Sequence, residues 1–171
     1  MSYTLTALNT SIDYMQESID GAAIVNGGVV YTGDQMTVLG TISSGDETVI
    51  DGFVVGGQLE FAKEAKMSTV KTNTSNLIAS GFTYSGKTFP LVVDSRSNYI
   101  GIQTFGGFPY NIQTINQDDV LNIADQAAYD LFVNAGLTRY RYIKDGESDL
   151  IIEVRDATTI PLVDAIVDTR T

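Results

Sequence analysis

Between residues 21 and 57, short apolar segments alternate with segments rich in glycine, asparagine, serine and aspartate. The apolar segments are AAIV, VVY, MTVL, TVI and FVV. Short runs of β-forming residues between turn formers are typical of short strands joined by tight turns. About 37 residues of this kind bury little core alone. We therefore expect either that neighbouring copies or a partner complete this part of the fold, or that it is an ordinary β-meander packed on the rest of the chain.

The residues before this β-rich part predict a short helix or an arm. Ile12, Met15 and Ile19 are spaced three and four apart, which gives one apolar face that needs a partner surface. Charge then marks a boundary, because residues 1–62 contain eight acidic side chains and no lysine or arginine, while the whole chain has a formal net charge of −11. We expect a β-rich attachment or oligomerisation module over residues 1–57 and a second domain over residues 58–171.

The second domain is predicted to begin with a helix over residues 58–80 that ends at Gly81. Its stripe at helical spacing is only partly apolar, which favours a surface or a seam between subunits over a buried core. The stripe consists of Leu59, Ala62, Lys66, Val70, Asn73 and Leu77.

Further helices and one strand are expected along the rest of the chain. Asp94 or Ser95 is a suitable cap for a helix over 95–105, and residues 108–114 have the pattern of a strand. A helix is expected from the cap Asn116, with two aspartates in its first turn, to Gly136.

The segment RYRYIKDGESDLIIEV fits a hairpin around Asp145-Gly146 or a helix, and the helix is favoured. A last helical turn is expected from Thr159, with Pro161 inside it. Together these patterns predict an α+β fold, in which a small N-terminal all-β segment of short strands precedes a mainly helical domain that contains a short β-hairpin.

Residues 81–88, GFTYSGKT, match the letters of a phosphate-binding loop. Such a loop needs a buried strand before it and a helix directly after it, and neither flank has that pattern. The residue pattern favours a hairpin in which FTY and KTF pair around a two-residue turn. We therefore expect Gly81, Ser85 and Gly86 to be structural turn residues.

Composition removes most enzyme mechanisms. The chain has no cysteine and no histidine, so thiolate nucleophiles, disulfides and histidine bases are absent. The alternating acids Asp145, Glu147 and Asp149 begin like a calcium loop but lack its later glycine and closing glutamate. We expect no enzymatic activity, no cofactor and no bound metal.

The same composition limits the partners. A chain this acidic repels the phosphates of nucleic acids. No run of apolar residues is long enough to span a membrane, and no signal peptide is visible. We expect no binding to nucleic acid or membrane.

Four aromatic residues in a glycine-rich context form a possible interaction surface, although packing in the core is the commoner role for such residues. They are Tyr99, Phe105, Phe108 and Tyr110.

The order of motifs in residues 58–171 resembles a small domain of uncharacterised function found at the C-termini of phage tail-fibre and other virion proteins. In that family a helix leads into a G-hydrophobic-x-Y-x-G-x-x-F hairpin, followed by an aspartate with serine or arginine nearby. The matching residues here are Gly81, Phe82, Tyr84, Gly86, Phe89, Asp94, Ser95 and Arg96. The ending DGESDLIIEVRDATTIPLVDAIVDTR also resembles that family.

This resemblance implies a structural component of a phage virion, made in the host cytoplasm and incorporated in the particle. We expect a tail, baseplate or fibre protein that mediates assembly or attachment, contacts other virion proteins and forms a homo-oligomer, with a trimer favoured. The alternatives are a capsid decoration or head-fibre protein, and a host-receptor or glycan-binding module.

Overall fold

The computed structural model describes residues 3–6, 12–22, 27–32, 35–40, 42–105 and 107–171. Helices account for 63% of the structure and strands for 16%, and the strands form short antiparallel pairs. The fold is therefore mixed α+β and mainly helical, which confirms the predicted fold class.

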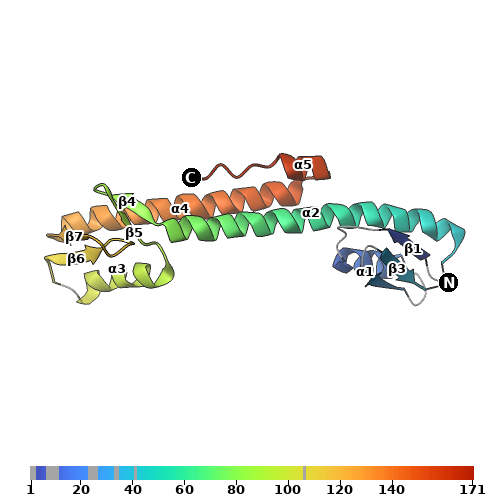
Figure 1. Ribbon diagram of the computed structural model, residues 1–171, viewed down its shortest axis with the longest axis horizontal. Helices are drawn as coiled ribbons and strands as arrows, with labels where there is room; N and C mark the ends of the chain where they lie inside the picture. The colour runs from blue at the N-terminus through green and yellow to red at the C-terminus, as the bar shows by residue number, and fades with distance from the viewer. Residues whose placement is uncertain (1–2, 7–11, 23–26, 33–34, 41, 106) are drawn as a thin grey trace. The chain divides into compact units, whose positions relative to one another are not determined.

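Helices and strands follow one another in the order shown in Figure 1. The elements are β1 (Tyr3–Thr6), α1 (Ile12–Gly21), β2 (Gly28–Thr32), β3 (Gln35–Leu39), α2 (Ser44–Ser80), β4 (Phe82–Tyr84), β5 (Lys87–Phe89), α3 (Val93–Phe105), β6 (Tyr110–Gln113), β7 (Val120–Ile123), α4 (Gln126–Asp156) and α5 (Ile160–Ala165).

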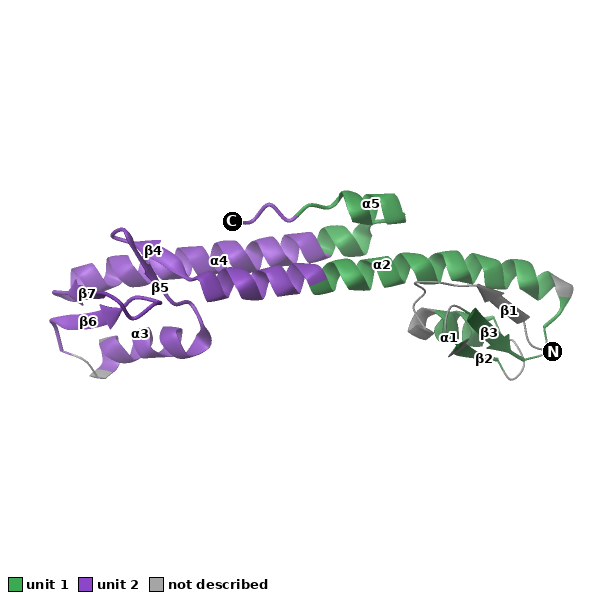
Figure 2. Ribbon diagram, viewed as in Figure 1, with its two compact units in different colours: residues 1–68, 152–167 green, residues 69–151, 168–171 purple. Residues whose placement is uncertain are grey.

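The chain forms two compact units, coloured separately in Figure 2. Unit 1 contains residues 1–68 and 152–167, and unit 2 contains residues 69–151 and 168–171. The predicted boundary after residue 57 falls within α2.

Unit 1 contains a three-stranded antiparallel sheet with the strand order β1-β3-β2. Its core is a cluster of buried apolar side chains from α1, β3 and the first turns of α2. They are Met15, Ile19, Met36, Val38, Ile50 and Val54. The prediction of a helix containing Met15 and Ile19 is confirmed, and so are strands at VVY and MTVL.

The strands predicted at residues 48–50 and 53–55 are wrong, because both segments lie in α2. Ile50, Val54 and Gly57 are buried at spacings of four and three, which is the period of a helix. At the start of this helix the Ser43 backbone N–H donates to Asp46 Oδ2 at 2.7 Å, so the Asp46 carboxylate satisfies a backbone donor at the helix N-terminus. The predicted strand at residues 22–25 lies largely outside the described residues.

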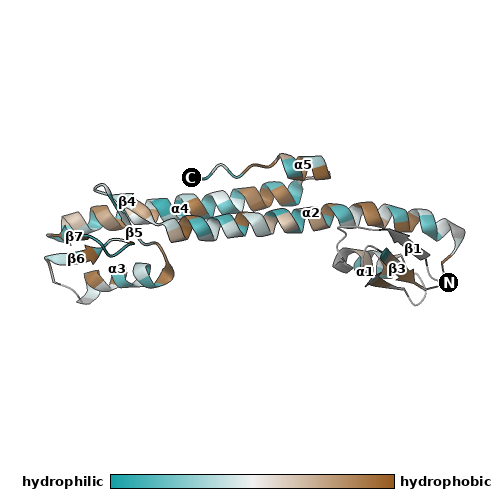
Figure 3. Ribbon diagram, in the orientation of Figure 1, coloured by the Kyte–Doolittle hydropathy of each residue, from teal (hydrophilic) through white to brown (hydrophobic). Residues whose placement is uncertain are grey.

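The predicted helix over 58–80 is confirmed as the second half of α2, which ends at Ser80 before Gly81. Figure 3 shows apolar and polar residues interspersed along all of α2 rather than gathered in one stripe. Val70 is buried, whereas the other members of the predicted stripe are partly exposed.

Unit 2 is built around a cluster of aromatic rings. The ring of Phe132, on α4, is fully buried and lies 5.0 Å from the Tyr99 ring and 5.1 Å from the rings of Phe82 and Phe89. The hairpins β4–β5 and β6–β7 and the helix α3 therefore share one core with α4.

The helix predicted from Asn116 to Gly136 is only partly correct. The strand expected over 108–114 is confirmed as β6, but it pairs with β7, which occupies residues expected to be helical. α4 begins later, where Asp125 Oδ1 accepts the backbone N–H of Ala128 at 2.9 Å in an N-cap arrangement. Gly136 does not end a helix but lies within α4, where an added Cβ would be 3.1 Å from Phe82 Cζ.

The C-terminal expectations are confirmed. The segment around Asp145-Gly146 is helical and belongs to α4, and Thr159 is the N-cap of α5 with proline in its first turn. Within unit 1, Lys66 Nζ donates to the Asp164 carbonyl oxygen at 3.4 Å.

The helix predicted over 95–105 begins two residues earlier, so Asp94 lies in its first turn. Among the described residues, no helix is long and apolar enough to cross a membrane.

Candidate functional site

The turn between β4 and β5 has the predicted hairpin geometry. Ser85 and Gly86 have φ values of 50° and 74°, and Tyr84 pairs with Lys87 across the turn. Positive φ at both central residues is the geometry of a type I′ turn, which matches the twist of paired strands. Gly81 also has a positive φ of 79°, and a Cβ there would collide with the Phe89 carbonyl.

The Lys87 side chain interacts with other groups of the protein. Its Nζ donates to the Val120 carbonyl oxygen at 2.6 Å and pairs with Asp119 Oδ2 at 2.8 Å. The hydrogen bond from Lys87 is the main cause that lowers the pKa of Asp119. A strand rather than a helix follows the GKT motif, and two aspartates line the adjacent cavity of about 220 Å³. This geometry does not provide the nest of N–H groups that binds phosphates.

A larger groove of about 640 Å³ lies between α3 and the β6–β7 hairpin, within unit 2. We call it the neutral groove, because its lining includes no charged side chain. It is lined by Pro90, Ser95, Asn98, Tyr99, Ile102, Tyr110, Asn111, Ile112, Gln113, Thr114, Ile115, Gln117 and Val120. Amides, hydroxyls and tyrosines thus supply its polar surface.

The four aromatic residues predicted as a surface have different positions. Tyr110 is 41% exposed and lines the neutral groove. Tyr99 is half-buried, and its hydroxyl donates to the Pro90 carbonyl oxygen at 3.0 Å; burial raises its pKa to about 12. Phe108 is partly buried against the Tyr129 ring at 6.1 Å. The side chain of Phe105 lies outside the described part of the structure.

A smaller, apolar cavity of about 310 Å³ lies on the other side of α3. Its lining includes Ile100, Leu137 and Tyr140, together with Arg96, whose guanidinium lies 4.0 Å from the centre of the Tyr140 ring. Arg96 Nε is buried without a hydrogen-bond partner in the described structure, and the cation–π contact offsets part of its desolvation.

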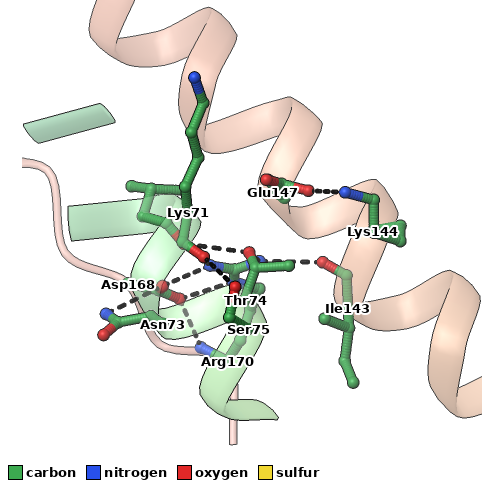
Figure 4. A network of polar contacts seen from close by, with 10 residues as sticks. Lys71, Asn73, Thr74, Ser75, Ile143, Lys144, Glu147, Asp168 and Arg170 are labelled. Atoms are coloured by element: carbon green, nitrogen blue, oxygen red, sulfur yellow. Dashed lines mark hydrogen bonds and ion pairs between the residues drawn. The ribbon is translucent and has the colours of Figure 1, made fainter. Parts of the chain in front are cut away.

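Figure 4 shows a network that we call the C-terminal clasp, formed by Arg170 and its partners. The Arg170 side chain is 5% exposed and pairs with Asp168. It also donates to Thr74 Oγ1 at 2.8 Å, the Ile143 carbonyl oxygen at 2.9 Å and the Val70 carbonyl oxygen at 3.2 Å. The clasp therefore joins the parts of α2 and α4 that belong to unit 2.

The hydrogen bonds that the Arg170 guanidinium donates all end on protein acceptors, so the clasp has a structural role. The Arg170 hydrogen bond is the main cause that lowers the pKa of Asp168 to about 2. Sequence analysis did not identify either residue, because their partners on α2 and α4 are far away in the chain. Gly146 is compatible with the clasp because it has no Cβ; a Cβ at this position would collide with the Arg170 side chain.

The acids once considered as a calcium loop lie along α4, where Glu147 pairs with Lys144. In the part of the chain that the structure describes, no group of three or more acidic side chains is placed to hold a metal ion.

No protein-family model, curated protein or solved structure matches this chain.

Proposed function

We propose that this chain is a structural component of a phage virion, in the tail, baseplate or fibre, and that it assembles with copies of itself through unit 1. The observation that carries the proposal is a pair of exposed aliphatic side chains on the outer face of the sheet in unit 1. On this outer face Val30 is 46% exposed and Leu39 is 42% exposed.

The register of the sheet separates its two faces. Met36 and Val38 are buried on the inner face, so Thr37 and Leu39 belong to the outer face of β3. Val30 pairs with Thr37, and directly paired residues share a face. Val30 and Leu39 are thus apolar neighbours on the outer face.

The small size of the N-terminal core supports assembly. The inner face of the sheet contributes Met36 and Val38 to a core of only six buried side chains. Small sheets with so little buried surface are marginally stable alone. Burial of the outer face against another copy would remove apolar area from water and stabilise both copies. The resemblance of residues 58–171 to virion domains supports a place in a phage particle.

The assembly proposal is tested by light scattering on size-separated protein. The wild type is expected to form an oligomer, with a trimer favoured. The double variant V30D/L39D should weaken association by about 100-fold, because two aliphatic contacts of about 1.5 kcal/mol each are lost. The matched control is V93D, which places aspartate at an exposed valine in unit 2 and should leave the oligomer unchanged.

A folded wild-type monomer at micromolar concentration would contradict assembly, and so would an oligomer that survives in V30D/L39D. Mass spectrometry of purified particles from the encoding phage tests the virion proposal separately. If the protein is absent from these particles, the proposal is rejected. Gold labelling then gives the position: labelled heads would favour the decoration or head-fibre alternative over a tail protein.

A further inference from the structure

We infer that the neutral groove of unit 2 binds a neutral saccharide. This inference goes beyond the proposed assembly, since it concerns a different unit and holds whether or not the chain is part of a virion. Three features carry it: the chemistry of the lining, the free hydrogen-bonding groups and an exposed aromatic ring.

The lining excludes charged ligands. No side chain in it can form an ion pair with an anion or a cation. The adjacent turn carries Asp118 and Asp119, and the chain has a formal net charge of −11, so anionic ligands are repelled. A neutral, polar ligand therefore fits the groove best.

Several polar side chains in the groove are available to a ligand. Asn98, Gln113 and Gln117 are exposed, and no other described residue forms a hydrogen bond with their side-chain amides. Asn111 Oδ1 accepts a hydrogen bond from Asn122 at 2.9 Å, which orients the Asn111 amide and leaves its own N–H groups free. Each amide both donates and accepts, so a pair of amides can match the adjacent hydroxyls of a sugar ring, which also do both.

Tyr110 supplies the apolar contact that a sugar ring needs. Tyr110 lines the groove together with Asn98 and Gln117, on the face of β6 opposite to Asn111 and Gln113, and remains 41% exposed. A pyranose has a face of C–H groups that can lie on an aromatic ring while its hydroxyls bond the amides. Tyr99 forms the fixed wall, because its hydroxyl is bound to Pro90 and its ring packs on Phe132. The groove volume of about 640 Å³ is within the range of ligand sites and has room for more than one sugar unit.

The experiment is an NMR titration of the full chain with glucose, galactose, mannose and N-acetylglucosamine, each as the free sugar and as a linear oligosaccharide. At least one series is expected to shift the amide signals of groove residues at millimolar concentration. Tighter binding of the oligosaccharide would point to a polysaccharide as the source, and equal binding to a free sugar. Glucuronic acid, which differs from glucose by one carboxylate, should bind more weakly.

Variants connect the shifts to the groove. Y110A should weaken binding by about tenfold through loss of the ring contact. N98D, at an exposed position of α3, should weaken it by adding a charge to the lining. The control Y142A removes an exposed tyrosine on α4 outside the groove and should bind as wild type. Unchanged melting temperatures show that each variant is folded.

Absence of shifts with every neutral sugar would overturn the inference, as would shifts that Y110A and N98D both leave intact. Groove shifts that depend on protein concentration but not on sugar would overturn it in favour of a second copy of the chain as the occupant. None of these results bears on the V30D/L39D experiment, which tests assembly alone.

Discussion

Arg170 illustrates how unit 2 accommodates a charged side chain in its interior. A buried guanidinium is costly unless acceptors surround it, because its N–H groups lose their water. Here one carboxylate neutralises the charge, and a hydroxyl and two carbonyls accept the remaining bonds. The arrangement makes the C-terminal clasp sensitive to the charge of Asp168.

We predict that the clasp loses stability in acid. The pKa of Asp168 is lowered to about 2 from its ordinary value of 3.8, so the folded state favours the ionised carboxylate. The ionised Asp168 carboxylate contributes about 2 kcal/mol to the free energy of unfolding. This contribution is fully present above about pH 4 and is lost as the pH falls through the folded pKa. Denaturant unfolding of the wild type and D168N, measured from about pH 5 to about pH 2, checks this.

D168N should be less stable than the wild type near neutral pH, and the difference should shrink toward pH 2. The control is D156N, which removes a carboxylate from an exposed pair with Arg155 and should follow the wild type at every pH. A constant difference between D168N and the wild type across this range would contradict the assigned role of Asp168.

Single residues were predictable from sequence where their chemistry is local. Ser85 and Gly86 form a two-residue turn, and a turn of that length pairs FTY with KTF as the structure has them. Tyr110 was identified as an aromatic residue of a possible surface, but its groove depends on α3 and the β6–β7 hairpin together. Arg170 was not identifiable, because its acceptors lie on α2 and α4, at positions that no sequence pattern connects.

At the scale of elements, α2 shows why short apolar runs are ambiguous. The runs at residues 48–50 and 53–55 fit strands between turn formers, yet a helix begins before them, where the Ser43 backbone N–H donates to Asp46. Gly52 lies between these runs, so a glycine that looked like a turn signal is in fact helical. Gly136, which was expected to end a helix, likewise lies within helix α4.

We predict opposite effects for alanine at these two helical glycines. G52A should raise the free energy of unfolding by about 0.5–1 kcal/mol, because the site is exposed, nothing lies near the added methyl group and alanine favours helix. G136A should lower it by about 1 kcal/mol, because the added Cβ would lie 3.1 Å from Phe82 Cζ in the aromatic core.

Urea denaturation followed by circular dichroism measures both changes under identical conditions. The two variants are controls for each other, since they carry the same substitution in long helices. If G136A proved as stabilising as G52A, the close packing of Phe82 on α4 would be wrong.

At the scale of the whole molecule, charge opposes the proposed assembly. Residues 1–62 contain eight acids and no basic side chain, so copies that meet through unit 1 repel one another. Burial of Val30 and Leu39 in the proposed interface must overcome this repulsion.

We therefore predict that salt strengthens the oligomer. Screening shortens the range of repulsion from roughly 30 Å at 0.01 M to roughly 10 Å at 0.1 M salt, while apolar burial is little affected. Sedimentation analysis should show a lower dissociation constant at the higher salt concentration, whereas V30D/L39D should stay dissociated at both. Weaker association at high salt would instead indicate an interface held by ion pairs.

The fold class could be predicted from sequence because it depends on local periodicity and on the frequency of turn formers. The division into units could not. Unit 1 combines residues 1–68 with residues 152–167, and such a pairing of distant segments arises from packing that composition along the chain does not record.

The C-terminal clasp has a further consequence for the order in which unit 2 folds. Its bond from Arg170 to the Val70 carbonyl joins residues 100 positions apart, whereas the hairpins pair near neighbours. Contacts that close long loops tend to form late. The chain must lose conformational entropy to close the loop before the contact can stabilise it. The hairpins and the Phe132 cluster would then assemble first. Interactions that form after the transition state slow unfolding more than they speed folding, so the clasp would act mainly on the lifetime of the native state.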